Sequence, residues 1–296
     1  MARFANAGGA KSLCVAGGND PEVLNAVADA LRLGLVGRVV VTGDVGWIAR
    51  HLPADVAEQV DLRDGETPAE CANKAVEVVR AGEAGILMKG HVDSTSYLRA
   101  IVSRTNGLRD GGVLSNVTVA EMASYPKLLA ATDNGIVPAP DLDQKRQIIL
   151  NTARLFRGLG VDPVKVAAVA ATEKVSDALS ATRDAAALSE ESCNGEMPGF
   201  IVDGPFGYDV AVSRSAAISK KLDQSGVAGM ADLLLFPTIE AANAVAKSWK
   251  YHGQAETGSL VLGASVPVLL NSRSDSAARR INALLLALAA LAGETS

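Results

Sequence analysis

The stretch Ser12–Asp44, SLCVAGGNDPEVLNAVADALRLGLVGRVVVTGD, contains the pattern that decides the fold. Its first apolar run ends in two glycines and predicts a buried β-strand. Asp20 then stands at a helix N-cap position, Pro21 at the first helical position, and apolar residues follow at helical spacing. The run GRVVVTGD at 37–44 predicts the next strand. Strand, helix and strand in this order predict a βαβ unit with parallel strands.

The same alternation continues along the rest of the chain. Continuous runs of Val, Ile and Leu between helical patterns are typical of parallel strands whose two faces are both covered by helices. The sequence therefore predicts a doubly wound, mainly parallel α/β fold. The further runs lie at 85–90, 111–119, 127–133, 165–171, 199–204, 231–237 and 265–272.

An interruption around residues 132–146, TDNGIVPAPDLDQKR, indicates a domain boundary because Pro, Gly, Asn and Asp break the alternation there. A long helix is expected to follow, from Leu142 to about Leu159. The last strand and helix are expected to return to the first block. We therefore predict a discontinuous first domain, residues 1–138 plus 258–296, and a second domain, residues 139–257.

Composition and charge limit the kinds of partner. Of 296 residues, 48% are apolar and 21% charged, which gives enough apolar material for a large core. The formal net charge is −5, so no overall basic field would attract nucleic acid or an acidic membrane. An anionic ligand must instead be held by a few local cations and backbone amides.

The sequence also favours a reduced, cytoplasmic protein. Cys14, Cys71 and Cys193 are odd in number and widely spaced, which argues against a disulfide framework or a structural zinc site. The first residues lack the apolar segment of a signal peptide. The longest apolar stretch, at 281–293, is too short to cross a bilayer, which needs about 20 residues.

Polar residues that follow the predicted strands mark candidate sites, because ligands of open α/β sheets bind outside the carboxyl ends of the strands. Lys89, Gly90 and His91 leave one strand, and Asp93 or Ser94 is expected to cap the next helix. These residues can be a simple turn and helix cap. They can equally form an anion site made of a cation, a glycine that permits close approach, and free helix amides.

Two more candidates lie near the predicted boundary. Ser115 and Asn116 fall in an otherwise apolar strand, so they must find partners or face a cleft. Thr132 and Asp133 end the following strand, although the Asp-Asn-Gly sequence there is also a common turn.

A helix after residue 237 carries Glu240, Asn243, Lys247 and Lys250 along one face. A solvated surface explains such a face. Amide and ammonium groups at the end of a strand would also suit a phosphate group.

The stretch LLNSRSDSAARR, Leu269–Arg280, joins the last strand to the last helix. Ser272 and Asp275 match the pattern of a capping box. Arg273 remains unexplained by capping, since the dipole at a helix start disfavours a cation. A bound phosphate would explain it, because free helix amides and an arginine fork together make a strong phosphate receptor.

Common nucleotide, hydrolase and metalloprotease motifs are absent from the sequence. None of the patterns G-x-G-x-x-G after the first strand, G-x-x-x-x-G-K-[ST], G-x-S-x-G or H-E-x-x-H occurs. With three scattered histidines, no histidine-based metal site is expected.

Several of these segments occur together, and in this order, in one enzyme family. The segments ILMKGHVDSTSYLRAIV, TDNGIVPAPDLDQKRQIILNTA, VDGPFGYDVAVS, VAGMADLLLFPTIEAANAVAKS and GASVPVLLNSRSDSAARRINALLLAL resemble the phosphate acetyl/butyryltransferases, and most closely the phosphate butyryltransferase branch. The resemblance covers nearly the whole chain.

The resemblance implies two α/β domains like those of isocitrate and isopropylmalate dehydrogenases, with the active site in the cleft between them. It implies reversible acyl transfer between coenzyme A and inorganic phosphate, in a homodimer or higher homo-oligomer, with coenzyme A as substrate and no cofactor. It also implies that Arg273 binds the phosphoryl group and that Ser272 hydrogen-bonds near the thiol or carbonyl.

The chain departs from the family pattern at three positions. Lys250 replaces an arginine and Arg279 a proposed catalytic aspartate of the acetyl-specific members, and Ala242 replaces the glycine of the family's usual Gly-Asn pair. We therefore assign Asp275 as the general base, with Asp133 as its rival. Two alternatives stay open, a non-catalytic coenzyme A-binding relative and a metal- and NAD(P)-dependent decarboxylating dehydrogenase of the same fold.

Overall fold

The computed structural model describes residues 11–272 and 275–294. The chain divides into two compact units. The first unit contains the chain up to Gly112 and again from Gly258, and the second unit contains Val113–Thr257. The chain thus passes from the first unit to the second after Gly112, well before the expected boundary at residue 138. The reason is that residues 113–138 carry two strands that pair with each other and with a strand of the second unit.

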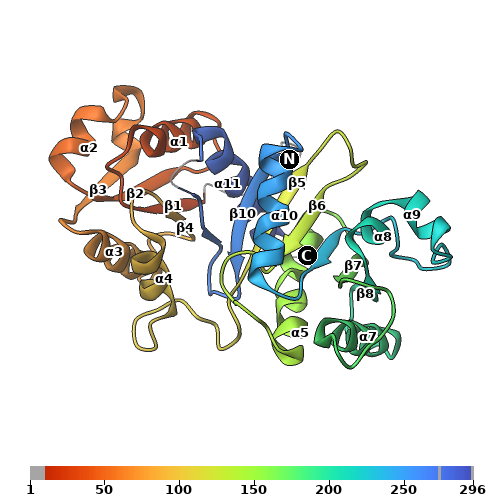
Figure 1. Cartoon of the computed structure of the whole chain (residues 1–296). Helices are drawn as coiled ribbons and strands as arrows, with labels where there is room; N and C mark the ends of the chain where they lie inside the picture. Colours follow the sequence, from red (N-terminus) through yellow and green to blue (C-terminus); the bar gives the residue numbers. More distant parts are fainter. Residues whose placement is uncertain (1–10, 273–274, 295–296) are drawn as a thin grey trace. The chain divides into compact units, whose positions relative to one another are not determined.

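The first unit is built on a mainly parallel sheet with the strand order β3-β2-β1-β4-β11-β10 (Figure 1). Among the strand pairs described for this unit, β10–β11 is antiparallel and the others are parallel. The chain moves outward from β1 through β2 to β3 and then returns to the other side of β1 with β4. The strands are β1 (Ser12–Ala16), β2 (Arg38–Gly43), β3 (Val60–Asp64), β4 (Ile86–Lys89), β10 (Glu256–Leu262) and β11 (Val268–Leu269).

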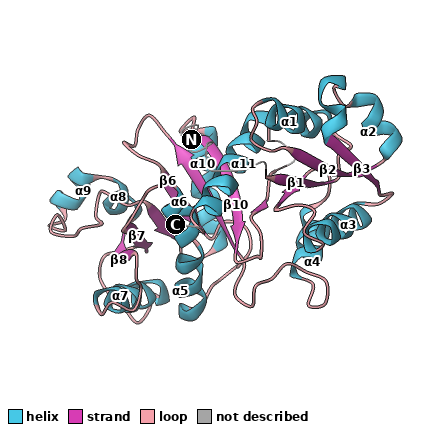
Figure 2. Ribbon diagram, turned by 180° about the vertical axis from the view of Figure 1, so that it is seen from behind, coloured by secondary structure: helices cyan, strands magenta, loops and turns pink. Residues whose placement is uncertain are grey.

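Helices cover both faces of this sheet: α1 and α11 lie on one face, and α3 and α4 on the other (Figures 1 and 2). The predicted caps are confirmed, because the Asp20 carboxylate accepts the Val23 N–H at the start of α1 and Asp93 accepts the Ser96 N–H at the start of α4. The helices are α1 (Pro21–Arg32), α2 (Val45–His51), the 3-10 helix η2 (Ala54–Gln59), α3 (Pro68–Arg80), α4 (Ser94–Val102) and α11 (Ala277–Ala292).

The second unit has the strand order β5-β6-β9-β7-β8. Strands β5 and β6 form an antiparallel hairpin, and β6, β9, β7 and β8 run parallel to one another. Because β9 lies between β6 and β7, the carboxyl ends of β6, β9 and β7 meet at one edge of the sheet. The strands are β5 (Ser115–Glu121), β6 (Leu129–Thr132), β7 (Val164–Val169), β8 (Phe200–Phe206) and β9 (Leu233–Leu235).

The predicted long helix after Leu142 is interrupted at Thr152. The Thr152 hydroxyl donates to the Ile149 carbonyl at 2.7 Å, and this back-bond competes with the regular helical pattern. The chain continues as a second short helix. The helices of this unit are α5 (Leu142–Asn151), α6 (Ala153–Gly158), α7 (Ser180–Cys193), α8 (Tyr208–Val212), α9 (Arg214–Ser219) and α10 (Ile239–Tyr251).

The predicted fold class is confirmed by this architecture, since both units have mainly parallel sheets with crossover helices. Among the described residues, no helix has the length and apolar character needed to cross a membrane.

Candidate functional site

Lys89 ends β4, and the turn that follows, with Gly90 and His91, packs across the end of β1. The Gly90 and His91 N–H groups donate to the carbonyls of Ala16 and Gly17, at 2.9 and 2.6 Å. A Cβ added to Gly90 would lie 2.1 Å from the Gly17 oxygen. A glycine is therefore needed at position 90 for contact between two turns of the protein itself.

Lys89 and His91 have different surroundings. Lys89 is buried, with 1% of its surface exposed. The His91 side chain is half exposed, and its Nδ1 lies 3.5 Å from Asp20 Oδ2. The turn thus presents a histidine beside a carboxylate, while the preceding lysine lies inside the unit.

The segment between β11 and α11 does not start the helix where the sequence suggested. Ser272 donates its N–H to Asp275 Oδ2 at 2.7 Å, and the Asp275 N–H donates back to the Ser272 carbonyl at 3.1 Å. Ser276 is the N-cap residue of α11, four residues after Ser272. Ser272 is therefore not the N-cap residue that a capping box would make it. Arg273 lies outside the described residues.

The first turn of α11 is capped from another helix. The Glu22 carboxylate, on the first turn of α1, accepts the Ala277 N–H at 3.1 Å. A carboxylate at a helix start is favoured by the helix dipole. One of the amides expected to bind a ligand anion is therefore already bound to a carboxylate of the protein.

Arg280, which sequence reasoning did not select, belongs to this region. Only 2% of its surface is exposed, its Nη1 lies 3.5 Å from the Lys89 carbonyl, and its Nε has no hydrogen-bond partner among the described residues. Burial lowers the pKa of Arg280, and the charges of Asp275, Asp20 and Glu22 oppose that shift. One sequence signal could have indicated that Arg280 is buried. It is the second arginine of the pair at 279–280 and stands three residues before the continuous apolar run of the helix.

In the second unit, a group of polar side chains lies where β5 starts beside the end of β6. Thr132 donates its hydroxyl to the Asn116 carbonyl at 3.0 Å, and the Asn116 N–H donates to Asp133 Oδ1 at 3.1 Å. Ser115 is the first residue of β5, and its hydroxyl accepts from Asn151 Nδ2 at 3.0 Å. Asn116, Thr132 and Asp133 are thus brought together, whereas Ser115 bonds to α5.

The Asp133 carboxylate is held almost entirely by backbone amides. Oδ1 accepts the N–H groups of Asn116, Gly135 and Ile136 at 3.1, 2.9 and 3.1 Å, and Oδ2 accepts that of Val137 at 3.0 Å. Burial raises the pKa of Asp133, and these four N–H groups oppose the rise. A carboxylate whose lone pairs are used in this way is well suited to fix the loop after β6 and poorly suited to accept a further proton.

Asn134 connects this group to helix α10. Its side-chain Oδ1 accepts from Asn116 Nδ2 at 2.6 Å, its Nδ2 donates to Thr118 Oγ1 at 2.7 Å, and its carbonyl accepts from Asn243 Nδ2 at 3.0 Å. Sequence reasoning treated Asn134 only as part of a turn. We name Asn116, Thr118, Thr132, Asp133, Asn134 and Asn243 the amide cluster.

The lysines of α10 lie further along the helix than Asn243. Lys247 is exposed, and Lys250 Nζ lies 5.5 Å from the centre of the Tyr251 ring. Seven residues separate Asn243 from Lys250, which corresponds to about 10 Å along a helix axis. Ala242 is fully buried in the core of the unit with Phe236 and Trp249, so its methyl group fills interior space.

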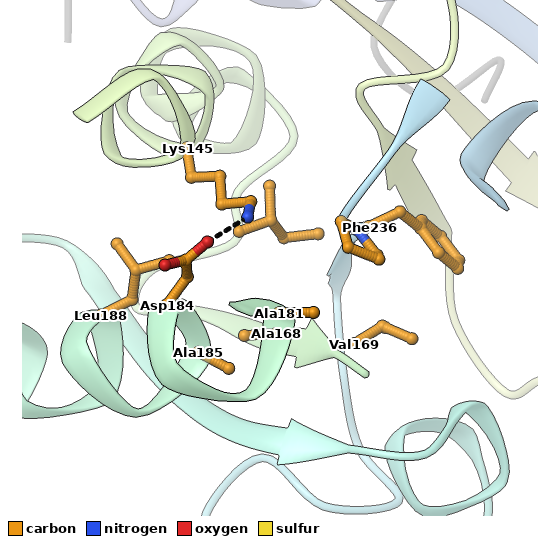
Figure 3. Close-up of a pocket in the computed structure, with 10 residues that line it drawn as sticks. Lys145, Ala168, Val169, Ala181, Asp184, Ala185, Leu188 and Phe236 are labelled. Atoms are coloured by element: carbon orange, nitrogen blue, oxygen red, sulfur yellow. Dashed lines mark hydrogen bonds and ion pairs between the residues drawn. The ribbon is translucent and has the colours of Figure 1, made fainter. Parts of the chain in front are cut away.

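A small pocket at the carboxyl ends of β7 and β9 contains an ion pair between a buried lysine and a partly exposed aspartate (Figure 3). Lys145 Nζ lies 2.5 Å from Asp184 Oδ2, and Lys145 is 5% exposed. The space open to the centre of a water-sized molecule is about 10 Å³, which is room for about one water. The two charges therefore neutralise each other, and the pocket is too small for a substrate.

Comparison with known proteins assigns the chain to a family. The model of the phosphate acetyl/butaryl transferase family matches residues 65–288. The chain therefore belongs to the phosphate acetyl/butyryltransferase family, as the resemblance of its motifs indicated.

Individual relatives agree with this assignment. A probable phosphate butyryltransferase of Bacillus subtilis (strain 168) is 39% identical over 280 residues, which cover 95% of this chain and 93% of the relative. A phosphate acetyltransferase of Thermotoga maritima is 38% identical over 270 residues, which cover 91% of each chain. The crystal structure of a branched-chain phosphotransacylase from Enterococcus faecalis V583 superposes with a TM-score of 0.83 at 26% identity, covering 95% of this chain and 99% of that one.

Proposed function

We propose that the protein catalyses reversible transfer of a short acyl group, of the butyryl or acetyl type, between coenzyme A and inorganic phosphate. The observation that carries the proposal is the family match over residues 65–288. The 39% identity to the probable phosphate butyryltransferase of Bacillus subtilis supports the butyryl type. Coenzyme A is a substrate in this reaction, and we propose no further cofactor.

In the direction of acyl-CoA formation, the coenzyme A sulfur attacks the carbonyl carbon of the acyl phosphate. The C–S bond forms, the bond from the carbonyl carbon to the phosphate oxygen breaks, and phosphate leaves. The thiol has an ordinary pKa of about 8.5, so a base that takes its proton increases the fraction of coenzyme A present as the nucleophilic thiolate. General base catalysis of this kind typically contributes about 100- to 10,000-fold.

We assign the base to Asp275 and the phosphoryl contact to Arg273. Asp275 is partly exposed, and its Oδ2 accepts the Ser272 N–H at 2.7 Å. Asp133, the rival, is only 2% exposed and has both oxygens bound to backbone amides, which favours the more accessible Asp275. Ser272 donates to the oxyanion that develops on the carbonyl, a contribution of about 3 kcal/mol in comparable sites.

We assign the remaining candidate residues to substrate binding. Lys89, Gly90 and His91 shape the first unit next to the segment that carries Asp275. Asn116, Thr132, Asp133 and Asn243 shape the amide cluster, and Ser115 supports it through α5. Lys247 and Lys250 supply positive charge for phosphate groups, with Lys250 acting as a point charge where a planar arginine fork would bind two oxygens.

The test is release of coenzyme A from acetyl-, propionyl-, butyryl- and isobutyryl-CoA, with and without phosphate. Phosphate-dependent thiol release supports the proposal, and the preferred chain length identifies the acyl group. Arg273→Ala should reduce the rate by orders of magnitude without unfolding the protein, and near-normal activity would remove Arg273 from the mechanism. Tight coenzyme A binding without phosphate-dependent release would support the non-catalytic alternative.

We also propose that the enzyme works in the cytoplasm as a homodimer. Cys14, Cys71 and Cys193 are free in the described part of the chain, which fits a reducing compartment. Light scattering during size-exclusion chromatography would measure the oligomeric state.

A further inference from the structure

The side chain of Asn116 carries an unsatisfied polar atom. Only 4% of the residue is exposed, and its Oδ1, which is shielded from solvent, has no hydrogen-bond partner within the part of the chain that the structure describes. Buried polar groups normally have partners, and leaving one unpaired destabilises the folded protein. A ligand that supplies the missing partner would remove this cost.

The orientation of the amide decides what kind of partner is missing. Asn116 Nδ2 donates to Asn134 Oδ1, and Asn134 Nδ2 donates to the Thr118 hydroxyl. Turning the Asn116 amide alone would place its oxygen against Asn134 Oδ1. Turning both amides would leave an N–H group of Asn116 unpaired in place of a carbonyl, which is the less tolerated arrangement. Asn116 therefore presents a hydrogen-bond acceptor.

The surroundings of this acceptor disfavour phosphate as its partner. The Asp133 carboxylate accepts the Asn116 N–H at 3.1 Å, so negative charge already lies beside it. Within the described part of the chain, the side chains that hydrogen-bond to Asn116 or Asn134 include no cation. A phosphate dianion offers acceptor oxygens and would meet both an acceptor and a like charge here.

We infer that Asn116 Oδ1 accepts a hydrogen bond from an amide N–H of the pantetheine arm of acyl-CoA, and that Asn134 is the positioning residue that aims it. The inference rests on the proposed function. The pantetheine arm is neutral and carries two amide N–H groups, so it matches the charge and the missing donor. The amide cluster then recognises the coenzyme A arm and leaves phosphate to other residues.

Asn134 is suited to its role by three contacts. Its side chain bridges Asn116 and Thr118, and its carbonyl receives Asn243 from α10. The neighbouring Gly135 allows Asn116 to approach, because a Cβ at position 135 would lie 3.1 Å from the Asn116 Cβ. The free oxygen of Asn116 is thereby held from a strand, a loop and a helix at once.

Steady-state kinetics with butyryl-CoA and phosphate test the inference. Asn116→Ala should raise the KM for butyryl-CoA about tenfold, equivalent to about 1.4 kcal/mol, and leave the KM for phosphate within about twofold. Asn134→Ala should raise the same KM by a smaller factor. The double variant should have the same KM for butyryl-CoA as Asn116→Ala alone, because both changes remove the same contact. Asn194→Ala, an exposed asparagine in the same unit, is the matched control.

A second measurement uses the unaltered protein and so does not depend on how the variants fold. S-butyryl pantetheine is compared with an analogue in which ester oxygens replace both amide N–H groups. The wild-type protein should use the ester analogue about tenfold less efficiently, whereas Asn116→Ala should hardly distinguish the two.

The outcomes separate the inference from the proposed function. No phosphate-dependent release of coenzyme A by the wild type would overturn the proposed function itself. An active wild type that uses both pantetheine thioesters equally well would overturn the inference alone. A rise in the KM for phosphate in Asn116→Ala, with that for butyryl-CoA unchanged, would also overturn it.

Discussion

Replacing Asp133 by asparagine tests whether this carboxylate fixes the loop after β6 or serves as the general base. Asparagine has nearly the same shape, and its Oδ1 can keep the three bonds from Asn116, Gly135 and Ile136 as neutral ones. Its Nδ2 would face the Val137 N–H, so that bond is lost and a donor is left unpaired.

The size of the effect follows from these four bonds. Hydrogen bonds to a charged group contribute about 1.5–3 kcal/mol and neutral ones about 1 kcal/mol, and an unpaired buried donor costs about 1–3 kcal/mol. A neutral side chain is cheaper to bury, which offsets part of the sum. We expect Asp133→Asn to lower the free energy of unfolding of the second unit by about 2–4 kcal/mol, or its Tm by roughly 10 °C.

Tryptophan fluorescence allows the second unit to be followed by itself. The sequence has two tryptophans, Trp47 in the first unit and Trp249 in the second. In a Trp47→Phe background, the emission of Trp249 reports thermal unfolding of the second unit. Asp177→Asn, whose parent carboxylate is fully exposed, provides the control for loss of charge in that unit.

Two results would refute this reasoning. An unchanged Tm would show that the four bonds contribute little. A Tm within about 2 °C of wild type combined with a 100- to 10,000-fold loss of turnover would identify Asp133 as the base and displace Asp275.

Three further predictions concern other parts of the molecule. Gly90→Ala should destabilise the first unit by more than about 2 kcal/mol, because its Cβ would lie 2.1 Å from a carbonyl oxygen, whereas Gly85→Ala, with open space around it, should be neutral in the same thermal scan. Asp275→Asn should reduce thiol release at least 100-fold with a Tm loss equivalent to about 1 kcal/mol; near-normal turnover would leave it only a structural role. Hydrogen bonding to Lys220 lowers the pKa of Glu173 below its ordinary value of 4.5, so the ionised form favours the folded state. Glu173→Gln should therefore lower the Tm at pH 7, by an amount equivalent to at most about 1 kcal/mol for this partly exposed pair. The difference in Tm from wild type should disappear as the pH falls below 4.5, because the carboxylate is then protonated. A difference that grows on acidification would contradict this stabilising role of the ionised carboxylate.

The amino-acid sequence by itself determined the fold class and the family. Alternating apolar runs and capped helices predicted parallel α/β sheets because burial on both faces requires such runs. The caps at Asp20 and Asp93 could be located because capping depends on a few neighbouring residues. The order of the motifs indicated the acyltransferase family, which the comparisons confirmed.

Tertiary structure alone decided how the polar residues are used. Whether Asp133 is a free carboxylate depends on four amides, three from the loop after β6 and one from β5. Whether Gly90 serves a ligand depends on the carbonyl of a turn more than 70 residues earlier. The roles of Arg280 and Asn134 are apparent only in the folded chain, since burial and missing partners arise when distant segments pack together. Local patterns specify where strands and helices begin, but hydrogen-bond partners and desolvation are properties of the packed chain.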